Sequence, residues 1–146
     1  MSVRELLKQK RMDVISVEST QSVAEAARLL MEHGIGGLPV VGGGSLVGFI
    51  SERDVVHAVD GHSTNVRDVT IASIMRRPAP VCSQDDPIRE VMKRMTRERL
   101  RHLVVMDGDR LAGVLSVGDL VKHRLDQLET EAGVLRDYVA AQRATR

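Results

Sequence analysis

Two stretches of this chain decide its fold: Gly48-Phe49-Ile50-Ser51-Glu52-Arg53-Asp54 and Gly113-Val114-Leu115-Ser116-Val117-Gly118-Asp119. They lie 65 positions apart, and the same offset places residues 14–60 over residues 79–125 without a gap. Nine pairs of positions are then identical, eight of them between residues 38 and 56 of the first copy. A repeat of fixed period determines the architecture before any local pattern does. Because two copies are too few for a solenoid, the sequence predicts one globule with pseudo-two-fold symmetry and two related clefts.

The length of the chain sets how the two copies must pack. Its 146 residues fit two halves of about 60 residues, and a half of that size buries only about 60% of its unfolded surface. We therefore expect the copies to share a core, which must be aliphatic because Phe49 and Tyr138 are the only aromatic residues.

The composition excludes several classes of partner. Few aromatic residues and a formal net charge of +1 disfavour single-stranded and duplex nucleic acids, which need stacking side chains and a positive field, respectively. No apolar run approaches the roughly 20 residues that cross a bilayer. Cys82 is the single cysteine, which excludes an internal disulfide and a cysteine-based zinc site. The sequence thus predicts a soluble, cytoplasmic protein without a nucleic acid or membrane partner.

Each copy predicts the same order of elements. A short β-prone run is followed by a helix with apolar residues at i, i+3, i+4 and i+7, and then by two apolar runs around a turn, which is typical of a hairpin. A second helix opens just after Ser51 and Ser116. The predicted unit is β-α-β-β-α, so the fold class is α+β or mixed α/β. In order, the strand runs are 14–17, 38–41 and 46–50 in the first copy and 80–82, 103–106 and 111–115 in the second.

Local signals place the ends of several helices. Ser22 and Glu25 have the spacing of a capping box, and Asp86-Pro87 offers an N-cap followed by proline at the first helical position. The turn-rich segment Asp60–Asp68 joins the copies, and Ile71–Met75 is expected to form a short helical turn.

The last helix is expected to run from Gly118 to about Ala140. Its apolar residues alternate spacings of four and three, which is the pattern of a coiled-coil seam, interrupted only by the helix-weak Gly133. We expect the seam to pack on a second copy, giving a homodimer, or on the apolar N-terminal residues Val3, Leu6 and Leu7. The seam consists of Val121, Leu125, Leu128, Ala132, Leu135 and Val139.

The repeated Ser-x-x-Asp has two interpretations. A Ser before a helix with an acid three residues later is a common capping device, and for one copy alone this is the stronger interpretation. The motif occurs twice, however, each time three residues after a glycine (Gly48, Gly113) that would let another group approach the backbone. A helix N-terminus with a Ser hydroxyl suits a phosphate, while an Asp suits the two hydroxyls of a ribose. Together they would hold a nucleotide.

These motifs resemble those of a pair of cystathionine-β-synthase (CBS) domains, a Bateman module. The resemblance covers residues 8–128 and rests on the ordered set of motifs in both copies. It implies CBS repeats over 8–62 and 70–128, with a helix over 118–142 extending the second. It also implies a regulatory module that binds adenosine-containing ligands (AMP, ADP, ATP, S-adenosylmethionine or NAD) between the repeats. The remaining motifs are Gly34-Ile35-Gly36-Gly37-Leu38-Pro39-Val40-Val41 and Arg101-His102-Leu103-Val104-Val105.

The resemblance also implies roles for single residues. Asp54 and Asp119 match the ribose-binding Asp. The hydroxyls of Ser51 and Ser116 match groups that contact the phosphate. Cations for the phosphate are implied at Arg53, Arg101 and His102, and the last two are expected near Ser116. The backbone that frames the adenine matches Val14, Ile15, Ser16, Ala79, Pro80 and Val81.

Other polar groups favour simpler interpretations. Gly42-Gly43-Gly44-Ser45 lacks the ending of a P-loop, so we expect a hairpin turn. A metal site at His57 and His62 is disfavoured, and Cys82 has no evident base to activate it. We therefore expect no required cofactor and no catalysis, with AMP as the first ligand, NAD, ADP or ATP as alternatives, and an unidentified effector protein as partner. Two rival functions remain, an enzyme and a pure interaction scaffold, in which Ser-x-x-Asp only caps helices.

Overall fold

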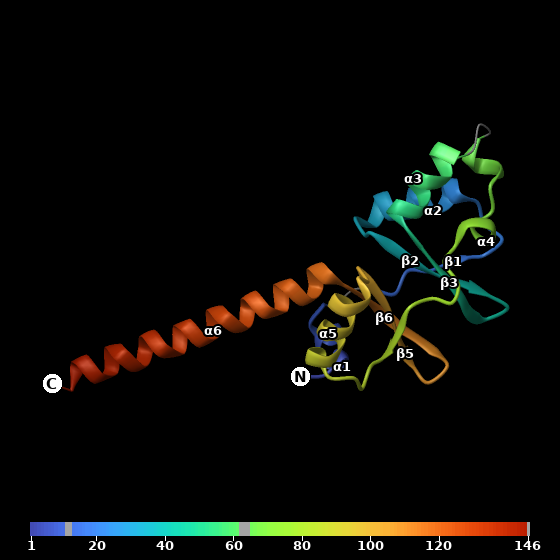
Figure 1. The fold of residues 1–146 in the computed structure, drawn as a ribbon. Coiled ribbons are helices and arrows are strands. Elements are labelled where there is room, and N and C mark those ends of the chain that lie inside the picture. The colour runs from blue at the N-terminus through green and yellow to red at the C-terminus, as the bar shows by residue number, and fades with distance from the viewer. Residues whose placement is uncertain (11–12, 62–64, 146) are drawn as a thin grey trace.

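A computed structural model describes residues 1–10, 13–61 and 65–145 of the chain. Two β-α-β-β-α units lie side by side, and one long helix projects from the second unit (Figure 1). The first unit consists of β1 (Val17–Glu18), α2 (Val23–His33), β2 (Gly37–Gly42), β3 (Ser45–Ser51) and α3 (Glu52–Gly61). The second consists of β4 (Val81–Ser83), α5 (Ile88–Glu98), β5 (His102–Asp107), β6 (Arg110–Ser116) and α6 (Val117–Ala144). Outside these units lie α1 (Val3–Lys10), the 3-10 helix η1 (Val66–Asp68) and α4 (Ile71–Ile74).

The two sheets have the same topology and register, which confirms the fold class and the internal repeat. In each, the opening strand runs parallel to the middle strand, and the middle strand pairs antiparallel with the third. Val40 lies opposite Gly48, as Val105 lies opposite Gly113, and both registers shift at the next residue. The hairpins turn through Gly43, Gly44 and Gly108, whose φ angles of 58°, 80° and 59° favour glycine.

Two predicted boundaries were wrong. Residues 14–16 precede β1, which spans only Val17–Glu18, so that most of the first β-prone run is not a strand. Helix α5 begins one residue later than expected, with Pro87 and not Asp86 as its N-cap. The Asp86 carboxylate instead accepts a hydrogen bond from the Ser83 amide at 3.0 Å. At α2 the prediction was half right, because Ser22 Oγ accepts from the Glu25 amide while the Glu25 carboxylate pairs with Arg28.

The short helix before each unit packs on the other unit. Helix α1 lies against the second unit, where the amides of Val3 and Arg4 donate to the carbonyls of Asp86 and Gln84 at 3.0 and 2.8 Å. Helix α4, predicted as a helical turn, lies against the first unit, where the Ile71 amide donates to the Gln21 carbonyl at 2.8 Å. This exchange ties the two units together at both ends.

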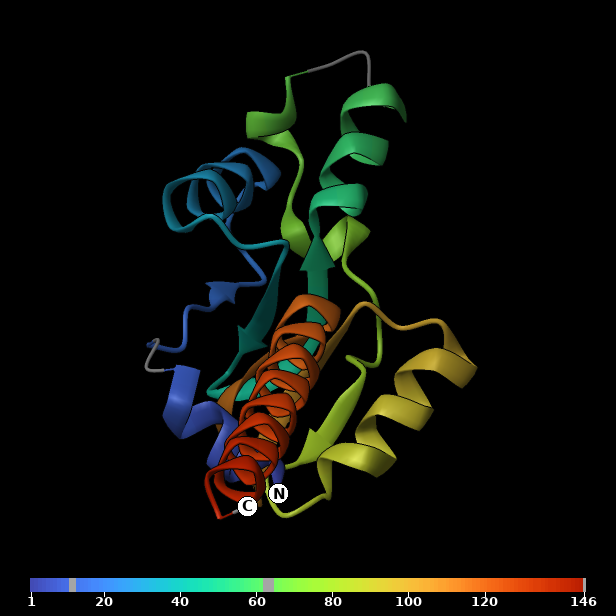
Figure 2. The ribbon, with the colours of Figure 1, turned by 90° about the vertical axis from the view of Figure 1, so that its left-hand side faces the viewer.

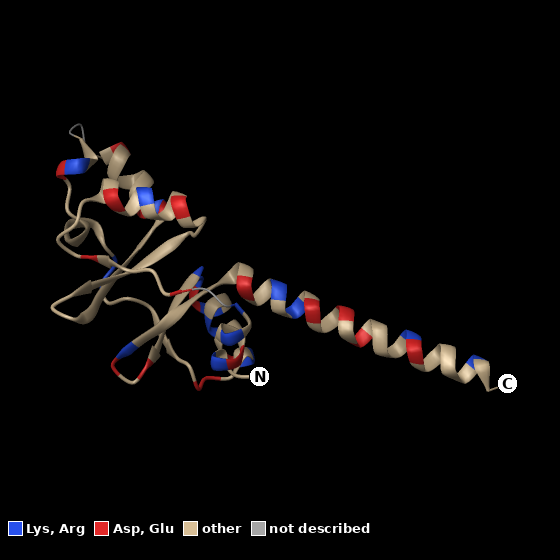
Figure 3. Ribbon diagram, turned by 180° about the vertical axis from the view of Figure 1, so that it is seen from behind, with Lys and Arg blue, Asp and Glu red and all other residues tan. Residues whose placement is uncertain are grey.

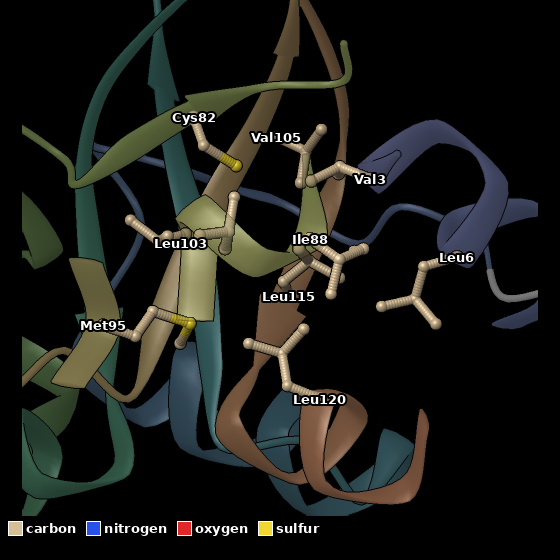
Figure 4. Packing of buried hydrophobic residues seen from close by; sticks show 10 residues of the cluster. Val3, Leu6, Cys82, Ile88, Met95, Leu103, Val105, Leu115 and Leu120 are labelled. Atoms are coloured by element: carbon tan, nitrogen blue, oxygen red, sulfur yellow. The ribbon is translucent and has the colours of Figure 1, made fainter. Parts of the chain in front are cut away.

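Each unit has its own aliphatic core, and the units share a third cluster. Figure 4 shows the core of the second unit, in which Val3 and Leu6 of α1 meet β5, β6 and α5. Between the units, the buried residues Phe49, Ala79 and Val104 form one cluster. The predicted shared core is therefore present.

Helix α6 is longer than predicted and leaves the globule. Leu120 and His123 are buried at its base, but its seam residues are exposed, from 40% at Val139 to 63% at Leu135. The expectation that Val3, Leu6 and Leu7 cover the seam was wrong, because α1 packs into the core of the second unit. Figure 1 shows α6 extending away from both sheets, and in Figure 2 the same helix points toward the viewer. Within the described residues no helix combines the length and apolarity needed to cross a membrane.

Candidate functional site

Both Ser-x-x-Asp motifs form reciprocal caps at the start of a helix. At α6, Ser116 Oγ accepts from the Asp119 amide at 3.1 Å, and Asp119 Oδ2 accepts from the Ser116 amide at 2.8 Å. At α3 the corresponding distances between Ser51 and Asp54 are 3.2 and 2.8 Å. The capping interpretation is thus correct for both copies. Capping occupies only Oδ2 of each carboxylate. The other oxygen, Oδ1, makes no hydrogen bond within the described chain and could still bind a ligand.

Of the first three backbone amides of each helix, two donate hydrogen bonds within the described chain and one does not. The first amide donates to a loop carbonyl, Glu52 to Gly36 and Val117 to Arg101, each at 3.0 Å. The third donates to the capping Ser. The second amide, of Arg53 or Gly118, has no partner in the described part of the chain. One amide therefore remains at the positive end of each helix dipole, where an anion is favoured.

Asp54 and Asp119 each lie in a pocket between the units, and we name each pocket after its aspartate. The Asp119 pocket has a volume of about 220 Å³ and the Asp54 pocket about 510 Å³. The Asp119 pocket is lined by Leu7, Lys10, Asp13, Ile15, Gly34, Ile35, Gly36, Gly37, His102, Val114, Ser116 and Asp119. The Asp54 pocket is lined by Gly36, Phe49, Ser51, Glu52, Arg53, Asp54, Val56, Arg76, Pro80, Arg99, Arg101 and His102.

Each pocket combines a helix start from one repeat with the opening segment of the other. Ile15, before β1, lines the Asp119 pocket, and Pro80, before β4, lines the Asp54 pocket. The same 65-residue offset relates Gly34 and Gly36 in the Asp119 pocket to Arg99 and Arg101 in the Asp54 pocket. The pockets therefore share a plan but differ in charge.

Four arginines line the Asp54 pocket: Arg53, Arg76, Arg99 and Arg101. The sequence analysis grouped Arg101 with Ser116. Both border an apolar groove between α5 and α6, but Arg101 also lines the Asp54 pocket and is not among the residues that line the Asp119 pocket. Arg99 has a φ of 55° at the C-cap of α5, where the first copy has Gly34 with a φ of 61°. A side chain at this angle is strained relative to glycine.

The cation of the Asp119 pocket comes from α1. Lys10 Nζ lies 2.9 Å from Asp119 Oδ2 and donates to the Val114 carbonyl at 3.0 Å. The two side chains retain 24% and 22% of their exposure, so the pair is partly buried. Lys10 was not predicted as a site residue, because it lies outside the two aligned stretches, residues 14–60 and 79–125. Arg76 and Arg99 were not predicted either, although Arg99 lies only two positions before Arg101.

His102 lies between the two pockets and lines both. Its ring stacks at 5.4 Å from the Phe49 ring and at 37° to it. Burial lowers the pKa of His102, with nearby Lys10 and Arg101 acting in the same direction and Asp119 and Glu52 opposing them. Burial therefore favours the neutral imidazole, a hydrogen-bonding group, over the cation that the resemblance implied.

The predicted adenine-framing residues are divided by the structure. Ile15 and Pro80 line the pockets, whereas Val14, Ser16 and Val81 are exposed and Ala79 is buried between the units.

The glycines before the two motifs serve the protein's own packing. A Cβ on Gly48 would lie 2.7 Å from Met75 Sδ, and one on Gly113 would lie 2.9 Å from Leu7 Cδ2. The group expected to approach these positions is thus the chain itself. In the pockets, a Cβ on Gly36 would lie 3.1 Å from His102 Nε2, so the imidazole would have to shift by a few tenths of an ångström to admit a larger residue.

The remaining candidates show no site chemistry. Burial raises the pKa of Cys82 to about 11, which keeps the thiol protonated. Within residues 1–10, 13–61 and 65–145, no group of three His, Cys, Asp or Glu side chains is placed to hold a metal ion. His57 lines a shallow pocket with Arg53 and Asp54, while His62 lies outside the described residues.

Comparison with known proteins identifies the family. The sequence pattern described as "CBS domain" matches residues 3–61 and again residues 66–126. The chain belongs to the CBS-domain family. Its fold resembles the crystal structure of the CBS-domain-containing protein ATU1752 from Agrobacterium tumefaciens, with a TM-score of 0.78 and 35% identity over 85% of this chain and 99% of that one.

Two further relatives are a CBS domain pair solved with bound ligands and an enzyme that this chain matches in part. The CBS domain pair of protein MJ0100, solved in complex with 5'-methylthioadenosine and S-adenosyl-L-methionine, has a TM-score of 0.76 and 28% identity, covering 87% of this chain and 98% of that one. Inosine-5'-monophosphate dehydrogenase from Korarchaeum cryptofilum is 39% identical over 109 residues, which are 74% of this chain. This chain spans only 22% of the length of that enzyme.

Proposed function

We propose that this CBS pair is a non-catalytic regulatory module that binds adenosine nucleotides in the Asp54 and Asp119 pockets. The observation that carries the proposal is the convergence, in each pocket, of a capped helix start, an aspartate with one free carboxylate oxygen and the opening segment of the other repeat. The MJ0100 pair, which has the same fold, was solved with two adenosine-containing ligands.

The chemistry of each group suits one part of a nucleotide. Oδ1 of Asp54 or Asp119 can accept hydrogen bonds from ribose hydroxyls, each worth about 1.5–3 kcal/mol because the acceptor is charged. The free amide of Arg53 or Gly118 can donate to a phosphate, and so can the Ser116 hydroxyl. The Ser51 hydroxyl donates to Asp54 Oδ2 at 3.0 Å and would have to rotate away from it to reach a phosphate. Ile15 and Pro80 offer apolar and backbone surface to the base.

The two pockets should prefer different ligands. The Asp54 pocket, with four arginines and a volume of about 510 Å³, falls in the usual range for small-molecule sites and suits phosphorylated ligands. We expect AMP there first, with NAD, ADP and ATP as alternatives. The Asp119 pocket, at about 220 Å³, is smaller and contains Lys10. It suits a ligand with little or no phosphate.

Calorimetry on protein stripped of bound ligand tests the proposal. Adenosine, AMP, ADP, ATP and NAD are titrated into the wild type and into the Asp54→Ala and Asp119→Ala variants. Each substitution is expected to weaken binding in its own pocket at least about tenfold and leave the other pocket unchanged. A thermal-shift panel provides a second readout, since a ligand at 100 times its Kd adds about 2.7 kcal/mol to stability.

An interaction scaffold is the second candidate. The observation that favours it is that both motifs already act as complete helix caps. No heat and no thermal shift with any of the five compounds would favour the scaffold over the nucleotide module.

A further inference from the structure

The exposed seam of α6 is an apolar feature of the surface that the proposed function does not use. All residues from 124 to 145 are exposed apart from Gly133, which is partly so. Leu125, Leu128 and Leu135 retain 54%, 45% and 63% of their exposure. A helix of this length that touches nothing is stabilised by burying its apolar side against a partner.

The charges beside the seam indicate which partner fits. In heptad notation Leu125, Ala132 and Val139 are a positions, and Val121, Leu128 and Leu135 are d positions. The flanking e and g positions are basic near the globule (Lys122, Arg124), acidic in the middle (Glu129, Glu131) and basic again at Arg136 and Arg143. Figure 3 shows these charges distributed along α6.

In a parallel, in-register pair of α6 helices, each g residue faces the e residue five positions later on the other helix. Arg124 then faces the partner copy's position 129, which is Glu, and Glu131 faces position 136, which is Arg. Both contacts join opposite charges on each side of the pair. None of these four residues forms an ion pair within the described chain, so all are available.

An antiparallel pair has the opposite electrostatics. The antiparallel register that buries all six seam residues places Glu129 against Glu129 and Glu131 against Glu131 of the other copy. It also places Lys122 against Arg136. Like charges at these positions are destabilising, so the sequence of α6 disfavours this orientation.

We propose that α6 is a homodimerisation element, which pairs with α6 of a second copy of this chain as a parallel two-stranded coiled coil. Leucine at two of the three d positions suits a two-stranded assembly. The interaction holds two CBS pairs side by side at the same end of the coiled coil. It goes beyond the proposed nucleotide binding and does not depend on it.

Disulfide trapping of the full chain tests the orientation. Leu128→Cys places a thiol at a d position, where the two copies meet in a parallel dimer but not in the antiparallel one. Rapid cross-linking under mild oxidation is expected, whereas the wild type, whose Cys82 is buried, and Asp126→Cys, at an outward b position, should not cross-link. Equal trapping at positions 126 and 128, or none at 128, would overturn the proposal.

Charge reversal tests the pairing with an internal rescue. Arg136→Glu opposes Glu131 across the interface and is expected to raise the dimer dissociation constant about tenfold in sedimentation experiments. Adding Glu131→Arg to the same chain restores opposite charges and should restore the dimer. Helical propensity alone cannot explain such a rescue. A wild-type chain that is monomeric at tens of micromolar, or a tighter dimer with Arg136→Glu, would overturn the proposal.

Discussion

Lys10 Nζ lies 2.9 Å from Asp119 Oδ2, so that the helix before the first β-α-β-β-α unit supplies a cation to the predicted ribose site of the second. Helix α1 brings Lys10 there because Val3 and Leu6 are buried in the core of the second unit. The first repeat has no such contact, because the residue 65 positions after Lys10 is Met75. One difference in charge between the two pockets therefore comes from the N-terminal helix.

Replacing Lys10 should improve the binding of an uncharged nucleoside to the Asp119 pocket. In Lys10→Met the ribose no longer competes with the ammonium for the carboxylate. Because a partly exposed ion pair is worth about 0.2–1 kcal/mol, the affinity for adenosine should rise by up to about fivefold. Calorimetry with Lys8→Met, an exposed residue of the same helix, is the control. Weaker adenosine binding in Lys10→Met would show that the ammonium contacts the ligand instead.

Arg101→Ala should weaken the binding of phosphorylated ligands without changing the binding of adenosine. The guanidinium lines the Asp54 pocket, where a charge-assisted contact to phosphate contributes about 1.5–3 kcal/mol. AMP and ATP should therefore bind about ten- to a hundredfold more weakly, while adenosine binding stays the same. Arg97→Ala, on the exposed side of α5, is the control. Equal losses for AMP and adenosine would mean that Arg101 acts through folding.

Arg99→Gly should change stability and phosphate binding in opposite directions. Glycine relieves the strain of a φ of 55°, as Gly34 does in the first repeat, and should stabilise the fold by about 1 kcal/mol. The same change removes a guanidinium from the Asp54 pocket and should weaken ATP binding. Chemical denaturation and calorimetry on one preparation measure both effects. A less stable protein, or unchanged ATP affinity, would contradict this account.

The fold was predictable because the two repeats share one pattern. The parts of the site that depend on how the two units pack were not predictable from that pattern. Matching positions such as Val40 and Val105 fixed the strands and hairpins, because hydrophobic period and turn glycines are local signals. The crossing of Ile15 and Pro80 into opposite pockets could not be read locally, since it depends on how the two units pack. Lys10 was missed for the same reason.

The charge state of a side chain was harder to predict from the sequence than its place in the site. The resemblance to CBS pairs implied a cation at His102. Burial and the nearby cations Lys10 and Arg101 favour its neutral form, and both Lys10 and the stacked Phe49 come from other parts of the chain. Capping was one of two interpretations of the Ser-x-x-Asp motifs, and it could be read from the sequence because a cap is a contact over three residues.

His102 should make the protein less stable in acid. Burial lowers its pKa in the folded state, while in the unfolded chain the pKa stays near 6.5. The unfolded chain therefore binds the proton first as the pH falls. The stability that neutral His102 allows is complete above about pH 6.5 and is lost below it. In His102→Gln the free energy of unfolding should fall less between pH 7 and pH 5.

The change in the free energy of unfolding with pH distinguishes the effect of protonation from the effect of lost packing. His102→Gln also removes the stack on Phe49 and should be less stable at every pH, but only the change with pH reports the proton. His33→Gln, at an exposed position, should keep the wild-type slope. An unchanged slope in His102→Gln would show that other groups cause the acid sensitivity.

Gly133 is the weak point of α6, and replacing it should strengthen the dimer. A Cβ at this position meets nothing within 4 Å, and the residue is at an outward b position. Alanine is better than glycine in a helix interior by about 1 kcal/mol, so Gly133→Ala should raise helicity and lower the dimer dissociation constant at least about fivefold. Ala140→Gly, at the next b position, is the matched opposite change and should weaken the dimer by a similar factor. Circular dichroism and sedimentation measure both variants, and nucleotide affinity should stay constant throughout. A dimer that is indifferent to both changes would place the contact between copies outside α6.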